Sequence, residues 1–429
     1  MPARRKQDWR LPVEPLSRRK LLAAGAIAGG AAAAAAAHAQ TGVFGNPDRP
    51  AEGRINSSPM AFSNPGPQNP QLAEQLPSFQ DPPATDVSGM DLFWSSFNTA
   101  HKRVQAGGWA REVTQADFAI SDAVSGVNMR LGPGGVRELH WHQQAEWAVM
   151  TNGRCRITVL DAEGRPAIRE VGQGDLWYFP PGLPHSLQGL GTTGAEFVLV
   201  FDNGKASEFN TLLLNEWMAH TPPDVLAANF DLPVSAFRNI PVDDTWIFQG
   251  PPPMPLAQAQ AAVRSPLGEP KDQFTFSTND MRADKVTRGG SVKIIDTRNF
   301  PVSQTIAAAL VTVKPGGMRE LHWHPNADEW QYYIKGQARM TVFNTGPKAQ
   351  TADFKPGDIG VVKKSLGHYV QNTGSTDLVF MEIFKDSRYQ EVSLSQWLAG
   401  TPPDLLAAHL NMDPKLLEKF RSPRVVIPA

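Results

Sequence analysis

Two short histidine pairs are the residues of this sequence best suited to metal chemistry. His140 and His142 are two positions apart, so on a β-strand both imidazoles project from one face. His322 and His324 repeat that spacing, and each pair is followed by a glutamate and later by a third histidine. The two sets are His140, His142, Glu146 and His185, and His322, His324, Glu329 and His368. Three imidazoles and one carboxylate can ligate iron, manganese, zinc, nickel or copper and leave coordination positions open.

Strand histidines that are merely hydrogen-bonded are the alternative interpretation of a single pair, because histidine is common on half-buried strands. Duplication argues against it here. Residues 133–142 and 315–324 agree at nine of ten positions, and residues 221–224 reappear at 401–404. The sequence therefore predicts two copies of one domain, each with its own metal site.

The elements that must position these residues are short strands. Runs rich in β-branched and aromatic residues, such as 156–160, 176–179 and 338–343, alternate with turns, and the chain has 36 glycines and 37 prolines. This pattern is typical of a barrel or sandwich. Each copy then ends in a helical pattern, at 211–228 and 394–410. We expect an all-β fold with minor α content.

The same observations suggest a division of the chain into five parts. These are a leader at 1–39, a Pro-rich arm or linker at 40–88, a first domain at 89–248, a linker at 249–270 and a second domain at 271–429.

Composition excludes several classes of protein. The formal net charge of −1 offers no basic surplus for a nucleic-acid partner. The single cysteine, Cys155, rules out an intramolecular disulfide and any cysteine-based zinc or iron–sulfur site. We interpret Cys155 as a small core residue.

The amino terminus has the anatomy of an export signal. Arg18 and Arg19 precede an apolar run at 21–37, and Ala37-His38-Ala39 offers a cleavage site. The pattern is typical of a twin-arginine signal, which predicts export to a bacterial periplasm or secretion, with no membrane anchor after cleavage. An uncleaved anchor or a basic tail is the alternative, although the run is short for a membrane span. Residues 1–39 carry seven Lys or Arg and two Asp or Glu, so the remainder has a net charge of −6.

The motifs around the histidines resemble those of the cupin superfamily. Gly134, the first histidine pair, Glu146 and Gly153 match the first cupin motif, and residues 174–185 match the second. Copy two keeps the same pattern, except that Lys363 and Ser365 replace the usual Pro and Gly. The implied fold is two tandem cupin barrels, that is, double-stranded β-helices of the jelly-roll type.

A more specific resemblance is to bacterial bicupin oxalate decarboxylases. It is carried by Arg-Glu-Leu-His-Trp-His in both copies and by residues 177–180, 217–222 and 329–333, and it extends from about 110 to 410. It implies an enzyme with two Mn²⁺ per chain that splits oxalate into formate and carbon dioxide. Dioxygen is then required but not consumed overall. The resemblance also implies a homo-oligomer, a trimer or a hexamer.

Further site residues follow from this resemblance. Arg137 and Arg319, three positions before each first histidine, are expected to bind oxalate, with a surface salt bridge to Glu138 or Glu320 as the alternative. Glu208 matches the acid of a mobile loop and is expected to protonate the carbon left by carbon dioxide, unless it is only an exposed loop residue. Phe209 stands where that loop usually has Asn.

The second copy has a different set of candidates. Glu382 and Tyr389 match a carboxylate and a tyrosine near the second metal, and no comparable loop motif follows. We therefore rank the amino-terminal site as the main catalytic centre and the second metal as structural or electron-transferring. Trp141 and Trp323 lie between the paired histidines, where core packing explains them, or passage of an oxidising equivalent if they stack.

Two other functions compete with this prediction. An oxalate oxidase would release hydrogen peroxide, and the changed loop residue Phe209 is the feature that bears on it. A non-enzymatic bicupin for storage or binding is the second, although both ligand sets are complete.

Overall fold

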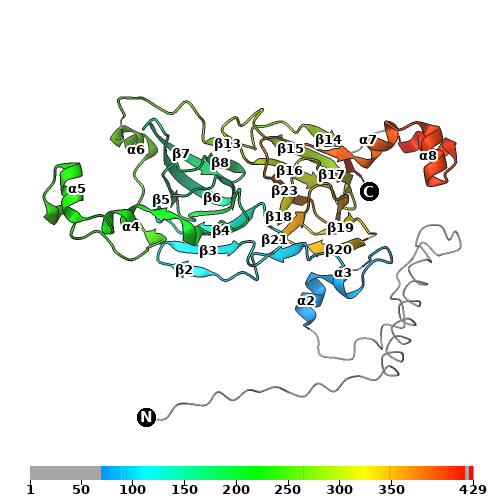
Figure 1. Ribbon diagram of the computed structural model, residues 1–429, viewed down its shortest axis with the longest axis horizontal. Coiled ribbons are helices and arrows are strands. Elements are labelled where there is room, and N and C mark those ends of the chain that lie inside the picture. Colours follow the sequence, from blue (N-terminus) through cyan, green and yellow to red (C-terminus); the bar gives the residue numbers. More distant parts are fainter. Residues whose placement is uncertain (1–68, 88, 264, 347, 421–424, 429) are drawn as a thin grey trace, which may run out of the picture.

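The computed structural model describes residues 69–87, 89–263, 265–346, 348–420 and 425–428. The predicted export signal and the first part of the predicted Pro-rich arm lie outside these residues. Two β-barrels lie side by side, and helices project from the outer end of each (Figure 1). The expectation of an all-β fold with minor α content is confirmed.

The first barrel is built from antiparallel strands in the order β11-β5-β9-β6-β10-β4-β3-β2, with β7, β8 and β12 beside them. Its long strand β6 pairs with β10 and β8 near its start and with β9 and β7 further on, so it runs through both sides of the barrel. The strands are β2 (Arg103–Gln105), β3 (Gly108–Val113), β4 (Ser125–Leu131), β5 (Gly135–Trp141), β6 (Glu146–Leu160), β7 (Pro166–Gly172), β8 (Asp175–Phe179), β9 (His185–Gly189), β10 (Ala195–Phe201), β11 (Leu212–Leu213) and β12 (Ile247–Gln249).

The second barrel repeats this design with one seven-stranded and one six-stranded sheet. Strand β17 carries His322, the first histidine of the second pair, and pairs with β22. The strands are β14 (Lys285–Thr287), β15 (Gly290–Ile295), β16 (Ala307–Val313), β17 (Met318–Trp323), β18 (Glu329–Lys335), β19 (Ala338–Asn344), β20 (Lys348–Phe354), β21 (Asp358–Val362), β22 (His368–Asn372), β23 (Leu378–Phe384), β24 (Val392–Ser393) and β25 (Val426–Ile427).

The two barrels exchange edge strands. Strand β1 (Trp94–Ser96), which precedes the first barrel in sequence, pairs with β21 of the second. Strand β13 (Thr275–Ser277), which precedes the second, pairs with β8 of the first. Each exchange covers a sheet edge that would otherwise expose unpaired backbone groups. One apolar core therefore joins the barrels and includes both Trp147 and Trp330.

The described end of the Pro-rich arm folds against the second barrel. Helix α2 (Pro70–Gln75) is capped by Asn69, whose side chain accepts from two backbone N–H groups, and α3 (Pro77–Gln80) follows directly. The Ser78 N–H donates to Asp353 at 2.7 Å, and the Gln75 amide donates to Asp358 at 2.6 Å. A composition that predicts an extended arm thus also supports two short helices, of which the first is capped by a side chain.

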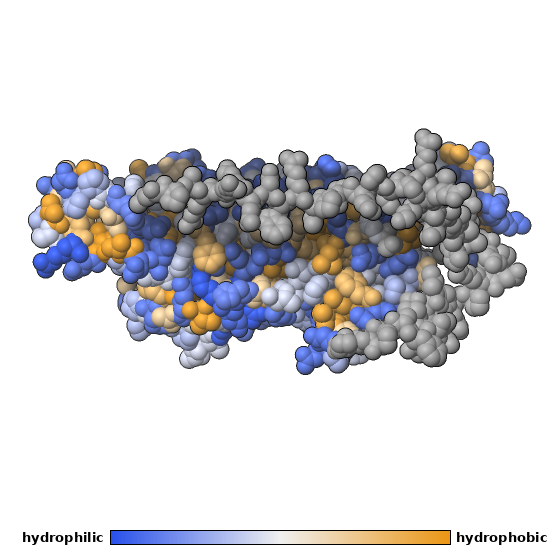
Figure 2. Space-filling model, turned by 60° about the horizontal axis from the view of Figure 1, so that its bottom comes forward, coloured by the Kyte–Doolittle hydropathy of each residue, from blue (hydrophilic) through white to orange (hydrophobic). Residues whose placement is uncertain are grey.

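Helices follow the last strands of each barrel, as the sequence pattern predicts. They are η2 (Glu208–Asn210), α4 (Leu214–Ala219), α5 (Pro223–Phe230), η3 (Val234–Phe237) and α6 (Leu256–Ala262), and then α7 (Leu394–Ala399), α8 (Pro403–Leu410), α9 (Pro414–Leu417) and η4 (Glu418–Phe420). Trp217 is 64% exposed and Trp397 61%. Figure 2 shows apolar side chains on both projecting ends. Among the described residues, no helix is both long and apolar enough to cross a membrane.

Candidate metal centres

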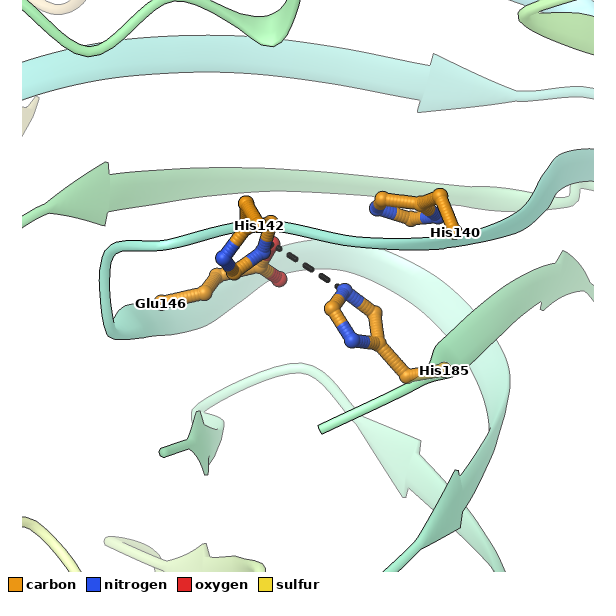
Figure 3. Close-up of side chains that lie close together, drawn as sticks. All are labelled: His140, His142, Glu146 and His185. Atoms are coloured by element: carbon orange, nitrogen blue, oxygen red, sulfur yellow. Dashed lines mark hydrogen bonds and ion pairs between the residues drawn. The ribbon is translucent and has the colours of Figure 1, made fainter. Parts of the chain in front are cut away.

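The first ligand set converges at one end of the first barrel. His140 lies near the end of β5, opposite His185 at the start of β9, and His142 follows two positions later. Glu146 begins β6 after a tight turn. The four side chains are buried and point toward one another (Figure 3), and their ligand atoms all lie within 4.8 Å of each other.

The second ligand set has the same construction. His322 on β17 faces His368 at the start of β22, and Glu329 begins β18. With His324, their ligand atoms again lie within 4.8 Å of one another, and all four residues are buried. The structure therefore brings all eight predicted ligands into two clusters.

Backbone hydrogen bonds leave the imidazoles ready to ligate. In all six histidines Nδ1 lies within hydrogen-bond distance of a backbone carbonyl oxygen, which fixes Nδ1 as the protonated nitrogen. Nε2 then carries the lone pair. The carbonyls are those of Glu138, Gln144, Leu183, Glu320, Gln390 and Leu366, at 2.6–3.1 Å.

The Nε2 atoms face the carboxylates without a proton to share. Within the described residues, the buried Nε2 atoms of His185, His322 and His368 have no hydrogen-bond partner. His142 Nε2 lies 3.2 Å from a Glu146 oxygen. Two acceptors at this distance repel unless a cation lies between them, so the donor set fits a divalent metal ion.

The electrostatics favour the protonation states that metal ligands need. Burial, reinforced by neighbouring Arg137, lowers the pKa of His140 well below its usual value. Burial opposes ionisation of Glu146, but the adjacent imidazoles of His142 and His185 hold its pKa well below the ordinary range. Neutral imidazoles and an ionised carboxylate are the forms that bind metal.

The second cluster differs in one histidine. Glu329 lies 2.7 Å from His368 Nε2, and this contact outweighs burial and raises the pKa of His368. Burial and Arg319 lower the pKa of His322 well below its usual value, as at the first site.

A buried arginine accompanies each cluster on the strand of the histidine pair. Arg137 is 2% exposed; it donates to the Thr211 hydroxyl at 2.9 Å and lies 3.7 Å from Glu138. Arg319 is fully buried and lies 3.3 Å from Glu382. Each barrel therefore holds a buried guanidinium cation beside its ligand cluster, because neither arginine reaches the surface.

Glu208 lies in the 3-10 turn η2 between β10 and β11. It is 3% exposed and forms an ion pair with Arg103 at 2.8 Å. The hydroxyl of Thr211 donates to the Glu208 carbonyl and accepts from Arg137, so the loop is tied to the arginine beside the metal cluster. Glu208 is thus a buried carboxylate, which an exposed loop residue would not be.

Glu382 lies on β23, in register with Gln331 of β18, and is fully buried. Burial raises its pKa, although Arg319 opposes the shift. Tyr389 donates to Glu391 at 2.5 Å and accepts from Arg319 at 2.9 Å. The structure therefore places both predicted residues beside Arg319.

Comparison with known proteins identifies the family. Residues 95–236 and 277–417 both match the Cupin family. The chain is 49% identical to the oxalate decarboxylase OxdC of Bacillus subtilis (strain 168) over 346 residues, which cover 81% of this chain and 89% of that protein. The chain belongs to the bicupin oxalate decarboxylases. It is also 39% identical to a probable oxalate decarboxylase of Arthroderma benhamiae, over 84% of this chain and 89% of that protein.

Solved structures of related proteins have the same fold as this bicupin. A Bacillus subtilis oxalate decarboxylase studied for its Mn(II) centres superimposes with a TM-score of 0.82 at 46% identity, over 85% of this chain and 96% of that chain. The resemblance to bicupin oxalate decarboxylases is therefore confirmed, and so are the two cupin domains.

The two sites of this bicupin differ in the groups that orient the carboxylate ligand. Trp177 donates its indole N–H to Glu146 at 2.7 Å. Gln331 donates to Glu329 at 2.7 Å and accepts from the Tyr333 hydroxyl at 2.6 Å. Such partners fix ligand orientation. Gln331 was not among the predicted site residues, although its spacing of two from Glu329 on a strand was an available signal.

Trp141 and Trp323 point away from the metal ligands. Each half-buried ring meets a tryptophan of the following helix edge to face, Trp217 at 5.6 Å and Trp397 at 5.8 Å. They therefore pack between strand and helical projection, near the surface of the chain.

Proposed function

We propose that this chain is a manganese-dependent oxalate decarboxylase that converts oxalate into formate and carbon dioxide, with dioxygen as a cofactor that is not consumed overall. The observation that carries the proposal is the first site. A complete set of three imidazoles and one carboxylate is buried in the first barrel, and the buried Arg137 beside it is tied through Thr211 to the loop that carries the buried Glu208. The similarity to the oxalate decarboxylases of Bacillus subtilis and Arthroderma benhamiae also supports this proposal.

Two manganese ions per chain would be held by His140, His142, Glu146 and His185, and by His322, His324, Glu329 and His368. When bound, the metal supplies positive charge that neutralises oxalate and withdraws electrons from it. Ligand type alone admits other divalent ions, so manganese rests on the relative whose structure has Mn(II) centres.

Arg137 is the proposed oxalate-binding cation of the first site. Oxalate is a dianion, and a planar guanidinium can bind one carboxylate through paired hydrogen bonds. Burial strengthens this interaction because little water competes with it. The body of the chain is acidic beyond residue 39, so capture of the anion depends on such fixed cations.

Glu208 is the proposed general acid. Loss of carbon dioxide leaves a carbon that must receive a proton, and a carboxylic acid held nearby can deliver it. The ties from Arg137 through Thr211 to the Glu208 carbonyl couple the position of the loop to the arginine that binds substrate.

Arg319 and Glu382 are the residues we propose for the second site. Arg319 is the oxalate-binding cation there, and Glu382 is the catalytic carboxylate. The loop that carries Glu208 is shortened there, because sixteen positions separate Phe201 from Trp217 and only thirteen separate Phe384 from Trp397. We therefore assign the main turnover to the first site and a structural or electron-transfer role to the second metal.

The test is one assay of purified protein with Mn²⁺ and oxalate under air, in which formate, carbon dioxide and hydrogen peroxide are measured together. Formate equal to carbon dioxide supports the decarboxylase. Two carbon dioxide per oxalate with stoichiometric peroxide would establish the oxidase instead, and the loop residue Phe209 is the feature that bears on this alternative. Protein that retains no metal and turns over no oxalate would indicate a non-enzymatic bicupin.

We also propose that the chain forms a homo-oligomer, a trimer or a hexamer. An apolar groove of about 620 Å³, lined in part by Leu139, Trp141 and Trp217, lies on the outside of the first barrel. Exposed apolar residues on α5 and α8, such as Phe230 and Leu405, are suited to fill such grooves on another copy. Light scattering with size-exclusion chromatography tests this, and a monomer at micromolar concentration would refute it.

Export through the twin-arginine pathway remains a proposal from residues 1–39. Cell fractionation and mass spectrometry of the mature amino terminus test it. Full-length protein in the cytoplasm would refute it.

A further inference from the structure

Arg103 packs into a corner formed by two aromatic rings at the edge of the first barrel. Its guanidinium carbon is 4.6 Å from the centre of the Phe209 ring and 4.7 Å from that of Trp246. The two rings meet edge to face at 5.3 Å. A guanidinium enclosed in this way is held by cation–π attraction on two sides and loses much of its freedom to move.

The enclosed guanidinium binds the acid of the loop. Its Nη2 lies 2.8 Å from Oε1 of Glu208. The other oxygen, Oε2, is buried and has no hydrogen-bond partner among the described residues. One oxygen is thus anchored by the ion pair, and the other makes no hydrogen bond to the described residues.

A second carboxylate fixes the backbone of the same loop. Glu112 of β3 accepts hydrogen bonds from the Ser207 hydroxyl at 2.9 Å and from the Glu208 N–H at 3.1 Å. The loop start is therefore attached to the barrel wall, and the ion pair described for the side chain of Glu208 is with Arg103.

This arrangement belongs to the first copy only. Lys285 occupies the position equivalent to Arg103 and is exposed, and the loop of the second copy is three residues shorter. Trp246 and Val425 share an unusual positive φ, 47° and 46°, and both carbonyls accept from the site arginine. The strained backbone at this position thus places a carbonyl oxygen against the site arginine in both copies. The aromatic ring of Trp246 is present only in the first copy, which has the longer loop.

Resting on the function proposed above, we propose that Arg103 is a positioning residue for Glu208. Phe209 and Trp246 hold the guanidinium, which holds one carboxylate oxygen and presents the other to the substrate carbon. Phe209, which replaces the family's usual Asn, adds the outer wall of this enclosure and is itself 51% exposed.

The experiment compares four variants of the manganese-loaded protein, with kcat, KM, formate and peroxide measured for each. Arg103→Met should lower kcat for formate about tenfold or more, because proton delivery is disturbed. KM for oxalate should stay within about twofold, because Arg103 does not bind the substrate. Arg103→Lys keeps a cation that can reach the carboxylate and should recover part of kcat, and Phe209→Asn should fall between wild type and Arg103→Met.

Arg111→Met is the matched control. Arg111 also lies over a tryptophan, Trp109 at 5.0 Å, but does not contact the loop. It should leave kcat and the product ratio at wild-type values. Wild-type kcat in Arg103→Met would overturn the inference, as would an equal loss in Arg103→Lys and Arg103→Met accompanied by loss of metal. Wild-type protein that makes no formate would refute the proposed function instead, so the two failures are distinguishable.

Discussion

Arg319 is ion-paired with Glu391 beside the second metal-ligand cluster, and this pairing distinguishes it from Arg137 beside the first. Glu382 contacts Arg319 from another side, at 3.3 Å. The ion pair described for Arg137 is with Glu138 at 3.7 Å, and its closest donation is to the neutral hydroxyl of Thr211. Burial outweighs the attraction of Glu208 and Glu138 and lowers the pKa of Arg137, whereas the carboxylates and Tyr389 around Arg319 outweigh burial and raise its pKa. The charge of Arg137 is therefore more available to an incoming dianion.

This difference predicts unequal effects of removing each arginine. Arg137→Gln should reduce kcat/KM for oxalate about a hundredfold or more, since a buried charge-assisted contact to the substrate is lost. Arg319→Gln should reduce it less than about tenfold, because two carboxylates already compensate its charge. Steady-state kinetics at equal metal content measure both. Arg169→Gln, at an exposed ion pair with Glu269, is the control. Equal losses for Arg137 and Arg319 would contradict the ranking of the two sites.

Removing the proposed acid should change the products. Glu208→Ala should abolish formate production, with any remaining turnover yielding hydrogen peroxide, because the carbon left by carbon dioxide no longer receives its proton. Coupled assays for formate and peroxide measure the partition. Glu163→Ala, an exposed carboxylate of the first barrel paired with Arg165, should leave the products unchanged. An unchanged yield of formate in Glu208→Ala would contradict the assignment of Glu208 as the general acid.

Each ligand set should bind one metal independently. His140→Ala and His322→Ala should each lower the metal content from two ions per chain to about one, because the intact cluster keeps all four ligands. His140→Ala should also abolish turnover, whereas His322→Ala should retain a measurable part of it. Plasma mass spectrometry and Mn(II) electron paramagnetic resonance measure occupancy. A variant that loses both ions at once would show that the sites are not independent.

The ligands could be predicted from the sequence because their geometry is local or periodic. A spacing of two on a strand fixes His140 and His142, and the repeat fixes their partners in the second barrel. Arg137 follows from the same strand. Contacts made across the fold have no such pattern: Arg103 is 105 positions before Glu208, and its approach depends on the register of β2 against β3.

The exchange of β1 and β13 between the barrels could not be predicted from the sequence either. Alternating apolar residues predict a strand, but they do not say which sheet edge the strand covers. Glu391 occupies the position that Thr211 has in the first copy, directly before a strand residue paired with the tryptophan of the histidine pair, and only the fold shows that this position faces the site arginine. Sequence patterns thus located the ligands, while the groups that distinguish the two sites depended on the fold.

The loop anchor Glu112 should make stability depend on pH. Burial raises its pKa above the usual value of 4.5, although hydrogen bonds from Ser207 and Glu208 oppose the shift. Between pH 4.5 and the raised pKa, the folded protein holds a proton that the unfolded chain has lost. Stability from this group is therefore complete at low pH and is lost as pH rises through the folded pKa.

Glu112→Gln removes that ionisation and keeps an oxygen that can accept from the Ser207 hydroxyl. The variant should therefore gain stability relative to wild type as pH rises from about 4.5 to about 7.5. Urea midpoints at both pH values, at equal metal content, measure the change. Glu163→Gln, a predominantly exposed carboxylate, should show no such gain. A difference between Glu112→Gln and wild type that stays constant with pH, or that shrinks as pH rises, would mean that Glu112 ionises as readily in the folded protein as in the unfolded chain.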